Sequence, residues 1–239
     1  MDQIENANAE PAELEKFDRL SDQWWDETGP LETLHAINPL RTKYITERTG
    51  LEGARLLDVG CGAGILSESL TRCGAKVTGI DLAADNIRVA REHAAEQGLD
   101  IDYRVASVET IATAEAGHFD VVTCLELLEH VPQPEAAVAH CARAVRPGGD
   151  VFFSTINRNL KSFMLAIVSA EYVLGMLPRG THEYLKLIKP SELSRAARLS
   201  GLVVEDLTGL HYNPLTRTYR LGGNVDVNYL LSARRPEAA

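Results

Sequence analysis

The feature that most constrains the fold is a glycine-rich turn that follows a short apolar run. The segment Arg55–Gly64 has the sequence RLLDVGCGAG, and residues with helical spacing follow it. Its leucines and valine predict a short buried strand. Gly60, Gly62 and Gly64 remove side chains where the backbone can approach a ligand. The run therefore predicts a strand, a ligand-binding turn and a helix in succession.

An acidic residue at the end of the next apolar run completes this pattern. Residues 77–81 read VTGID, and Asp81 lies 21 residues after Gly60. An acid about 20 residues beyond a glycine turn, at the end of the second strand, can accept hydrogen bonds from both ribose hydroxyls. Together the turn and Asp81 predict a site for a nucleotide-type cofactor.

The details of the turn narrow the kind of cofactor. No Gly-Lys-Ser/Thr sequence follows Gly64, so the turn is not a phosphate-binding loop of that type. The spacing Gly-x-Gly-x-Gly also differs from the dinucleotide fingerprint, and Asp58 lies two residues before the first glycine. A carboxylate there would repel phosphate and attract a cationic group, such as the α-ammonium of a methionine moiety. These residues favour a methionine-containing nucleoside over a dinucleotide.

Composition and charge limit the class of partner. The chain has 239 residues, a length that fits one large globular domain. Its formal net charge of −10 disfavours nucleic acid as a partner. Four cysteines form no Cys-x-x-Cys pair, which indicates reduced thiols in a cytoplasm. Residues 1–15 are polar and acidic, so we expect a disordered tail without a targeting signal. A small-molecule substrate is the expectation.

Alternating strands and helices predict an α/β fold. Strands are expected at 55–59, 76–81, 101–106, 119–124, 150–155, 202–207 and 225–231. Helices are expected at 63–73, 85–97, 134–145 and 190–200, and two more at 17–25 and 39–49. The early helices form an N-terminal cap over 16–50, and an apolar insertion occupies 158–190. We expect a single domain over 16–239 with a mostly parallel seven-stranded sheet whose C-terminal strand is antiparallel.

Five further motifs carry a family resemblance. They are NPLR at 38–41, TCLELLEHV at 123–131, PGGDVFFST at 147–155, GTH at 180–182 and GLHYNP at 209–214. From about Phe17 to Leu231 the chain resembles the bacterial ubiquinone-biosynthesis O-methyltransferases, a family of class I S-adenosylmethionine-dependent methyltransferases. The resemblance implies a Rossmann-like methyltransferase fold with S-adenosyl-L-methionine as methyl donor. It implies cofactor contacts at Arg41, Gly60, Asp81 and Leu125.

The resemblance also implies the acceptor. In this family one enzyme methylates a polyprenylated catechol and later demethylubiquinol. Many class I methyltransferases place an Asp-Ala pair after the third strand to meet adenine. This chain has ASVE at 106–109 instead, which leaves Glu109 or backbone groups for that contact.

The residues after the fourth strand are candidates for chemistry at the acceptor oxygen. Glu126, Glu129 and His130 have the spacing i, i+3 and i+4, which predicts one shared helical face. Two carboxylates and an imidazole can bind a divalent cation, and the matching residues of eukaryotic relatives are described as magnesium ligands. The resemblance thus implies Mg²⁺ as a second cofactor. The alternatives are a local Glu129–His130 pair, or His130 as a base without metal; His182 and His211 are alternative bases.

The insertion predicts a membrane contact. Leu160–Leu177 is apolar, too short to span a bilayer, and flanked by basic residues on an otherwise acidic chain. These properties suit an anionic membrane surface, and the expected location is the cytoplasmic, inner face of the bacterial plasma membrane. A core helix or an oligomer interface is the alternative. Other ubiquinone-biosynthesis enzymes are further candidate partners.

The functional alternatives stay within cofactor-binding proteins. The prediction is an O-methyltransferase of ubiquinone biosynthesis. A methyltransferase for another quinone or small phenol, a noncatalytic cofactor-binding regulator and a nicotinamide oxidoreductase are the other hypotheses.

Overall fold

The computed structural model describes residues 8–159 and 184–237, and these share one eight-stranded sheet. The strands are β1 (Arg55–Val59), β2 (Lys76–Asp81), β3 (Asp102–Val105), β4 (Phe119–Leu125), β5 (Val145–Ile156), β6 (Val203–Asn213), β7 (Thr218–Leu221) and β8 (Asn228–Arg234). Their order across the sheet is β3-β2-β1-β4-β5-β8-β6-β7. The first five strands are parallel, whereas β8 pairs antiparallel with β5 and β6, and β7 pairs antiparallel with β6.

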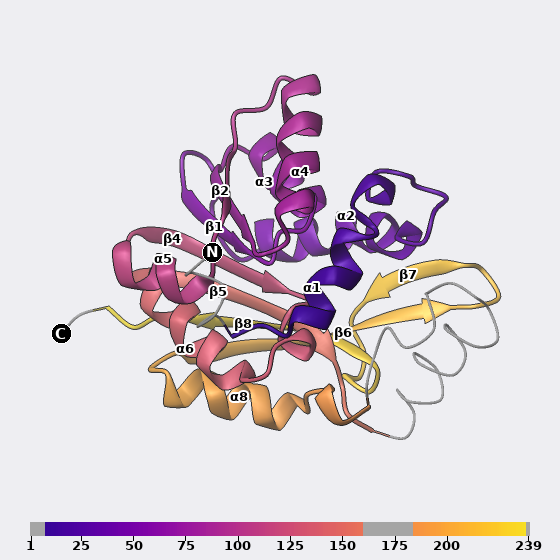
Figure 1. Ribbon diagram of the computed structural model, residues 1–239. Helices are drawn as coiled ribbons and strands as arrows, with labels where there is room; N and C mark the ends of the chain where they lie inside the picture. Colours follow the sequence, from indigo (N-terminus) through magenta and orange to yellow (C-terminus); the bar gives the residue numbers. More distant parts are fainter. Residues whose placement is uncertain (1–7, 160–183, 238–239) are drawn as a thin grey trace.

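Helices cover both faces of this sheet (Figure 1). The α-helices are α1 (Pro11–Asp18), α2 (Glu32–Thr46), α3 (Ile65–Arg72), α4 (Ala84–Glu96), α5 (Val108–Ala114), α6 (Pro134–Ala144) and α8 (Pro190–Leu199). Short 3-10 turns are η1 (Ser21–Gln23), η2 (Leu128–His130) and η4 (Tyr184–Lys186). The hydrophobic core on one face joins the strands to α5, α6 and α8, and that on the other face joins them to α2 and α3.

The alternating direction of side chains along each strand explains why the sheet has a hydrophobic core on each face. Leu57 packs with one core while its neighbour Leu56 packs with the other, and Phe153 and Phe152 divide in the same way. Successive side chains of a strand point to opposite faces, so a parallel strand covered on both faces is apolar over most of its length. The apolar runs of the sequence are therefore a direct consequence of the layered fold.

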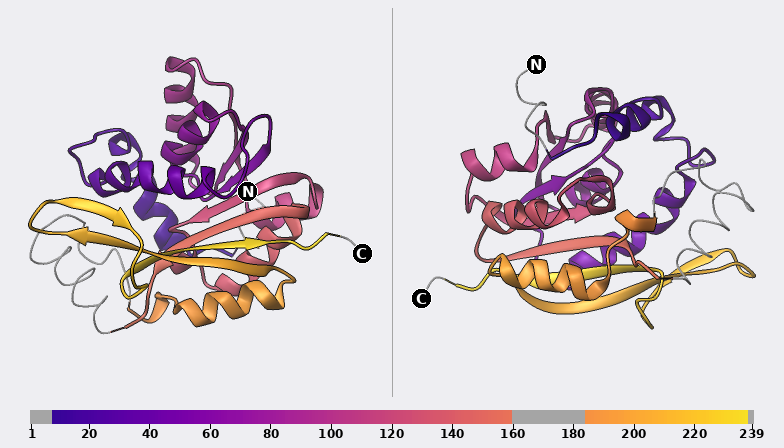
Figure 2. Two further views of the ribbon diagram at one scale, coloured as in Figure 1. Left: turned by 180° about the vertical axis from the view of Figure 1, so that it is seen from behind. Right: turned by 60° about the horizontal axis from the view of Figure 1, so that its bottom comes forward.

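The predicted α/β architecture is confirmed, with an eighth strand that the sequence analysis omits. All seven expected strands are present, and β7 adds a hairpin partner to β6. Helix α5 was also not predicted. In both views of Figure 2 the hairpin of β6 and β7 extends beyond the other strands, and Tyr219 and Leu221 of β7 pack against the core that includes α2.

The boundaries of the N-terminal cap differ from those predicted. Helix α1 begins at Pro11, inside the stretch 1–15 that was predicted to be disordered. The helix predicted at 17–25 is not formed as such, because α1 ends at Asp18 and only the 3-10 turn η1 follows it. Proline at the first helical position has a suitable φ and lacks only an N–H that would have no helical partner. This signal marks the true start of α1.

The second cap helix was predicted to begin at Pro39. It begins at Glu32, and Pro39 lies inside it. An interior proline costs about 3 kcal/mol. Ile37, Tyr44 and Ile45 of the same helix are buried against the sheet, and this burial offsets the cost.

The predicted insertion Leu160–Leu177 lies outside the described residues, as does His182. Within 8–159 and 184–237, no helix is both long enough and apolar enough to cross a membrane.

Candidate active site

A cavity of about 790 Å³ opens at the carboxyl ends of β1, β2 and β4. Its volume falls in the range of small-molecule sites, and open α/β sheets bind ligands at this edge. The glycine turn, Asp81 and Leu125 line one part of it. Apolar residues of the cap and of the β6–β7 hairpin line another part: Leu31, Leu34, Ile37, Leu210, Tyr212 and Tyr219. Segments from both ends of the chain thus meet the central turn in one cavity.

All three glycines of the turn have positive φ, at 70°, 53° and 92° in chain order. A β-carbon on Gly60 would lie 2.9 Å from the Leu127 side chain, and one on Gly62 would lie 2.2 Å from the Trp24 ring. Gly60 and Gly62 line the cavity, whereas Gly64 is not among its lining residues. The turn therefore needs glycine for packing as well as for ligand approach.

Gly64 has a structural role at the start of α3. It is the N-cap residue of α3, and the Tyr103 hydroxyl lies 2.1 Å from the place where its β-carbon would be. Glycine at this position permits the left-handed backbone that starts the helix and leaves room for Tyr103. Gly64 thus has a packing role beside the cavity, and its cofactor contact stays a prediction.

Asp81 links the second strand to the glycine turn. Its Oδ2 accepts a hydrogen bond from the Gly62 backbone N–H at 3.0 Å, and its Oδ1 accepts one from Ala83 at 2.8 Å. Each carboxylate oxygen keeps a further lone pair for a ligand hydroxyl. Burial raises the pKa of Asp81 to about 6, although the two backbone bonds oppose this shift.

Asp58 is held by two hydroxyl groups. Ser67 Oγ donates to its Oδ2 at 2.6 Å and Thr123 Oγ1 donates to its Oδ1 at 2.7 Å. The side chain is buried yet borders the cavity, and burial raises the pKa of this carboxyl. Asp58 therefore joins β1 to α3 and β4 and offers a carboxylate to the cavity.

Arg41 forms an ion pair with Glu126 at 3.1 Å between Nη2 and Oε1. Both residues line the cavity, and the Arg41 side chain is only 8% exposed. Glu126 Oε1 also accepts a hydrogen bond from Ser154 Oγ at 2.7 Å. The pair joins α2 of the cap to the residue that follows β4.

The prediction that Glu126, Glu129 and His130 share one helical face is wrong. Glu126 has a left-handed φ of 55°, and only Leu128–His130 form a turn, of 3-10 type. The chain bends sharply after β4, so α-helical spacing does not apply there. Across the two described stretches of the chain, no group of three or more His, Cys, Asp or Glu residues is placed to hold a metal ion.

Each of these three residues has a different neighbour. Glu126 pairs with Arg41, and Glu129 accepts a hydrogen bond from Thr155 Oγ1 at 2.7 Å. Burial and the charge of Glu126 raise the pKa of Glu129 to about 7. His130 Nδ1 lies 2.8 Å from Glu13 Oε2, a contact that the sequence analysis missed. The predicted magnesium ligand set is thus not supported by this arrangement.

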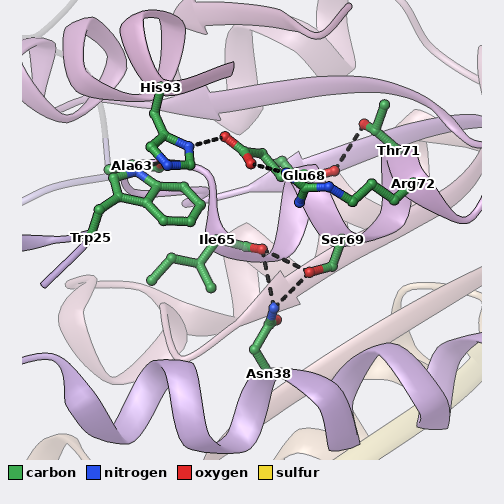
Figure 3. A network of polar contacts seen from close by, with 10 residues as sticks. Trp25, Asn38, Ala63, Ile65, Glu68, Ser69, Thr71, Arg72 and His93 are labelled. Atoms are coloured by element: carbon green, nitrogen blue, oxygen red, sulfur yellow. Dashed lines mark hydrogen bonds and ion pairs between the residues drawn. The ribbon is translucent and has the colours of Figure 1, made fainter. Parts of the chain in front are cut away.

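A polar network holds the cap against the helix that follows the glycine turn (Figure 3). Trp25 Nε1 donates to the Ala63 carbonyl at 3.2 Å, and its indole stacks on the His93 ring with centroids 3.5 Å apart. His93 Nδ1 lies 2.6 Å from an oxygen of the buried Glu68. Asn38 of α2 donates to the Ile65 carbonyl at 3.1 Å. The network fixes the turn from the side of the cap, and Asn38 and Ile65 also line the cavity.

Two other predicted residues line the cavity, namely Glu109 and His211. His211 Nε2 is buried and has no hydrogen-bond partner among the described residues. Asn86 also lines the cavity, and its buried Oδ1 likewise has no partner within that part of the chain. An acceptor of this kind fits a ligand that carries hydroxyl or amino groups.

Comparison with known proteins decides the family. A family model described as a methyltransferase domain matches residues 23–207. The ubiquinone biosynthesis O-methyltransferase of Aromatoleum aromaticum is 56% identical over 230 residues, which cover 96% of this chain and 98% of the relative. The protein of the same name from Paracidovorax citrulli is 58% identical over 233 residues, or 97% and 98% of the two chains. The chain belongs to the ubiquinone biosynthesis O-methyltransferases.

Solved structures agree on the fold. Magnesium protoporphyrin IX methyltransferase from Synechocystis, with bound SAH, has a TM-score of 0.67 at 19% identity, over 92% of this chain and 94% of that chain. The [4+2]-cyclase SpnF has a TM-score of 0.63 at 20% identity, over 84% and 81% of the two chains. At this identity the likeness concerns the fold alone.

The family assignment confirms the main functional prediction. The protein is an O-methyltransferase of ubiquinone biosynthesis, and its methyl donor is S-adenosylmethionine. The alternative hypotheses of a noncatalytic regulator and of a nicotinamide oxidoreductase are thereby disfavoured.

Proposed function

We propose that this methyltransferase methylates phenolic hydroxyls of polyprenylated catechol and demethylubiquinol intermediates, and that His130 takes up the proton of the acceptor hydroxyl. The observation that carries the proposal is the single cavity lined both by the glycine turn with Asp81 and by His130 with a set of apolar side chains. One cavity can then hold the methyl donor and an apolar aromatic acceptor together.

The donor part of the cavity fits S-adenosylmethionine. Asp81 has free lone pairs for two ribose hydroxyls, and Asp58 offers negative charge to an ammonium group. Arg41 and Leu125 also line the cavity and are proposed contacts. When bound, S-adenosylmethionine supplies an electrophilic methyl group on a sulfonium centre.

The acceptor part of the cavity suits a ring with an apolar chain. Leu31, Ile37 and Leu210 are buried around it, and Tyr212 and Tyr219 add aromatic surface from the hairpin. Removing apolar surface from water stabilises a complex by roughly 25 cal/mol per Å². These side chains therefore orient the acceptor and exclude water from its hydroxyl.

Proton removal is the chemical task left to the protein. A phenol titrates near a pKa of about 10, judged from tyrosine, so little of it is ionised at neutral pH. His130 is an imidazole on the cavity wall, 10% exposed, and a neutral imidazole can accept a proton. Its uptake of the acceptor proton raises the fraction of the reactive phenolate.

The test compares His130→Ala with wild type on a water-soluble catechol. We expect kcat to fall by about 10²- to 10⁴-fold, because a general base contributes roughly this much. Affinity for S-adenosylhomocysteine, measured by calorimetry, should stay within about twofold of wild type. The variant loses an interaction with the acceptor proton that forms only in the transition state, and it keeps the contacts to the donor. The defect should shrink as pH rises, because the acceptor then ionises without help.

The exposed His118 provides a matched control, and His118→Ala should retain wild-type turnover. Normal turnover of His130→Ala at neutral pH would show that His130 is not the proton acceptor. His211 would then be the next residue to test.

We further propose that the enzyme meets its acceptor at the inner face of the plasma membrane, where a polyprenyl chain dissolves. The basic residues that flank Leu160–Leu177 in the sequence support this. So does the tip of the β6–β7 hairpin, where Leu215 is 93% exposed beside the exposed Arg217. Apolar and cationic groups side by side suit anionic headgroups.

A further inference from the structure

Helix α1 lies along the wall of the cavity through Glu10, Glu13, Leu14 and Phe17. It buries no residue of its own. Polar contacts attach it at its start: Lys186 Nζ lies 2.8 Å from Glu10 Oε2, and Asn8 Nδ2 donates to the Gln133 carbonyl at 2.6 Å. A helix attached in this way positions polar side chains more than it contributes to the core.

One of those side chains reaches His130. Glu13 Oε2 lies 2.8 Å from His130 Nδ1, and the two side chains are 17% and 10% exposed. The Phe17 ring meets the imidazole edge-on, with centroids 5.1 Å apart and an interplanar angle of 88°. The imidazole is therefore constrained by a hydrogen bond and by an aromatic contact from one helix.

The contact also determines the tautomer of the imidazole. The hydrogen bond from His130 lowers the pKa of Glu13, so this carboxyl is ionised at neutral pH. An ionised carboxylate can only accept hydrogen bonds. Nδ1 of His130 must therefore carry a hydrogen and donate it to Glu13. In the neutral imidazole the basic lone pair then lies on Nε2.

We propose that Glu13 is a positioning residue for the methyl transfer, which holds His130 in the orientation and tautomer that present Nε2 to the acceptor hydroxyl. The inference rests on the proposed role of His130. The carboxylate also stabilises the positive charge that the imidazole gains with the acceptor proton, as in other carboxylate and histidine pairs. In this role Glu13 acts through His130.

The experiment compares Glu13→Gln and Glu13→Asp with a matched control, Glu15→Gln. Glu15 lies on the same helix and pairs with Arg19, and both of these side chains are exposed. Each variant is assayed on catechol and on 4-nitrocatechol, whose nitro group makes the hydroxyl more acidic. Calorimetry with S-adenosylhomocysteine and thermal unfolding are measured in parallel. Because α1 buries no residue, all three variants should fold.

We expect Glu13→Gln to lower kcat on catechol by about tenfold to a hundredfold, a part of the roughly 10²- to 10⁴-fold contribution of a general base. Its defect should be smaller on 4-nitrocatechol, since a more acidic hydroxyl needs less help with its proton. Glu13→Asp keeps the charge and should retain more activity than Glu13→Gln. Donor affinity and the Glu15→Gln control should match wild type.

Two results would overturn the inference. One is wild-type kcat in Glu13→Gln while His130→Ala is impaired, which rejects the positioning role and leaves His130 as the proton acceptor. The other is an equal loss on both acceptors, which assigns Glu13 to helix docking alone. Normal turnover in His130→Ala instead rejects the proposed proton acceptor itself.

Discussion

At the scale of single residues, Asp81 combines two roles, one in the structure of the glycine turn and one in the proposed binding of the donor. Its two oxygens hold the glycine turn and the start of the segment leading into α4, and they still have lone pairs for a ligand. A carboxylate in this position can fix the turn before the donor arrives, which reduces the ordering that binding requires.

The raised pKa of Asp81 predicts a pH dependence of donor binding. With a pKa of about 6, the carboxyl takes up a proton as pH falls below that value and then accepts hydrogen bonds from ribose less well. Affinity for S-adenosylhomocysteine should therefore be constant above about pH 7 and fall below about pH 6. Asp81→Asn should bind about 1.5–3 kcal/mol more weakly at neutral pH and lack this step. Calorimetry across the range measures both effects, and an unchanged step in Asp81→Asn would assign it to another group.

Local spacing was enough to single out Asp81, Gly60 and Gly62, which line the cavity, and their contacts with the methyl donor stay a prediction. It was not enough to predict why the glycines are needed, because Trp24, Tyr103 and Leu127 fill the space beside them from distant parts of the chain. Glu13 was missed for a similar reason. Its partner lies 117 residues away, and the polar stretch around it resembles a disordered tail.

At the scale of elements, the bend after β4 and the attachment of α2 have the largest effect on the site. The spacing of Glu126, Glu129 and His130 predicts one α-helical face, yet Glu126 has a left-handed φ and only Leu128–His130 form a 3-10 turn, so the three residues do not share such a face. No local signal marks this bend, since Glu126 is not a residue that favours positive φ. The long strands and helices α3, α4, α6 and α8 were predictable because their apolar periodicity is strong.

Asn38 is the main polar attachment of α2 to α3 (Figure 3). It is 8% exposed, and its Nδ2 donates to the Ile65 carbonyl at 3.1 Å and to Ser69 Oγ at 2.8 Å. Asn38→Ala should lower the free energy of unfolding by about 1–3 kcal/mol, because the Ile65 carbonyl and the Ser69 hydroxyl each lose a hydrogen-bond donor. Denaturant titration measures this change. Lys43→Ala on the exposed side of the same helix should change it by less than about 0.5 kcal/mol, and an equal effect of both would deny Asn38 a special role.

At the scale of the whole molecule, the alternation of strands and helices was sufficient to predict a layered sheet. It could not predict which segments close the cavity, because the cap and the β6–β7 hairpin meet only in three dimensions. The extra strand β7 was missed because Tyr219 and Leu221 pack against the core that includes α2, a contact that forms only in the folded chain.

The membrane proposal is tested on the whole protein. The enzyme should co-sediment with vesicles that contain anionic phosphatidylglycerol, and release by salt should follow because each basic residue near the surface contributes about 1 kcal/mol. Deletion of residues 160–177 should weaken sedimentation and turnover on a polyprenylated acceptor. Leu215→Ser is a smaller change with the same expected direction. Donor affinity and turnover on catechol serve as controls, and equal sedimentation of all three proteins at low salt would contradict membrane contact.

The division of the cavity has a consequence for how such enzymes diversify. In the proposed division, the donor part comes from the segment between β1 and η2 together with Arg41 of α2, whereas much of the acceptor part comes from other residues of the cap and from the β6–β7 hairpin. Mutations in these outer segments can alter the acceptor while leaving the donor contacts intact. A lineage can therefore exchange one substrate for another by small steps at its periphery, without an intermediate that has lost its methyl donor.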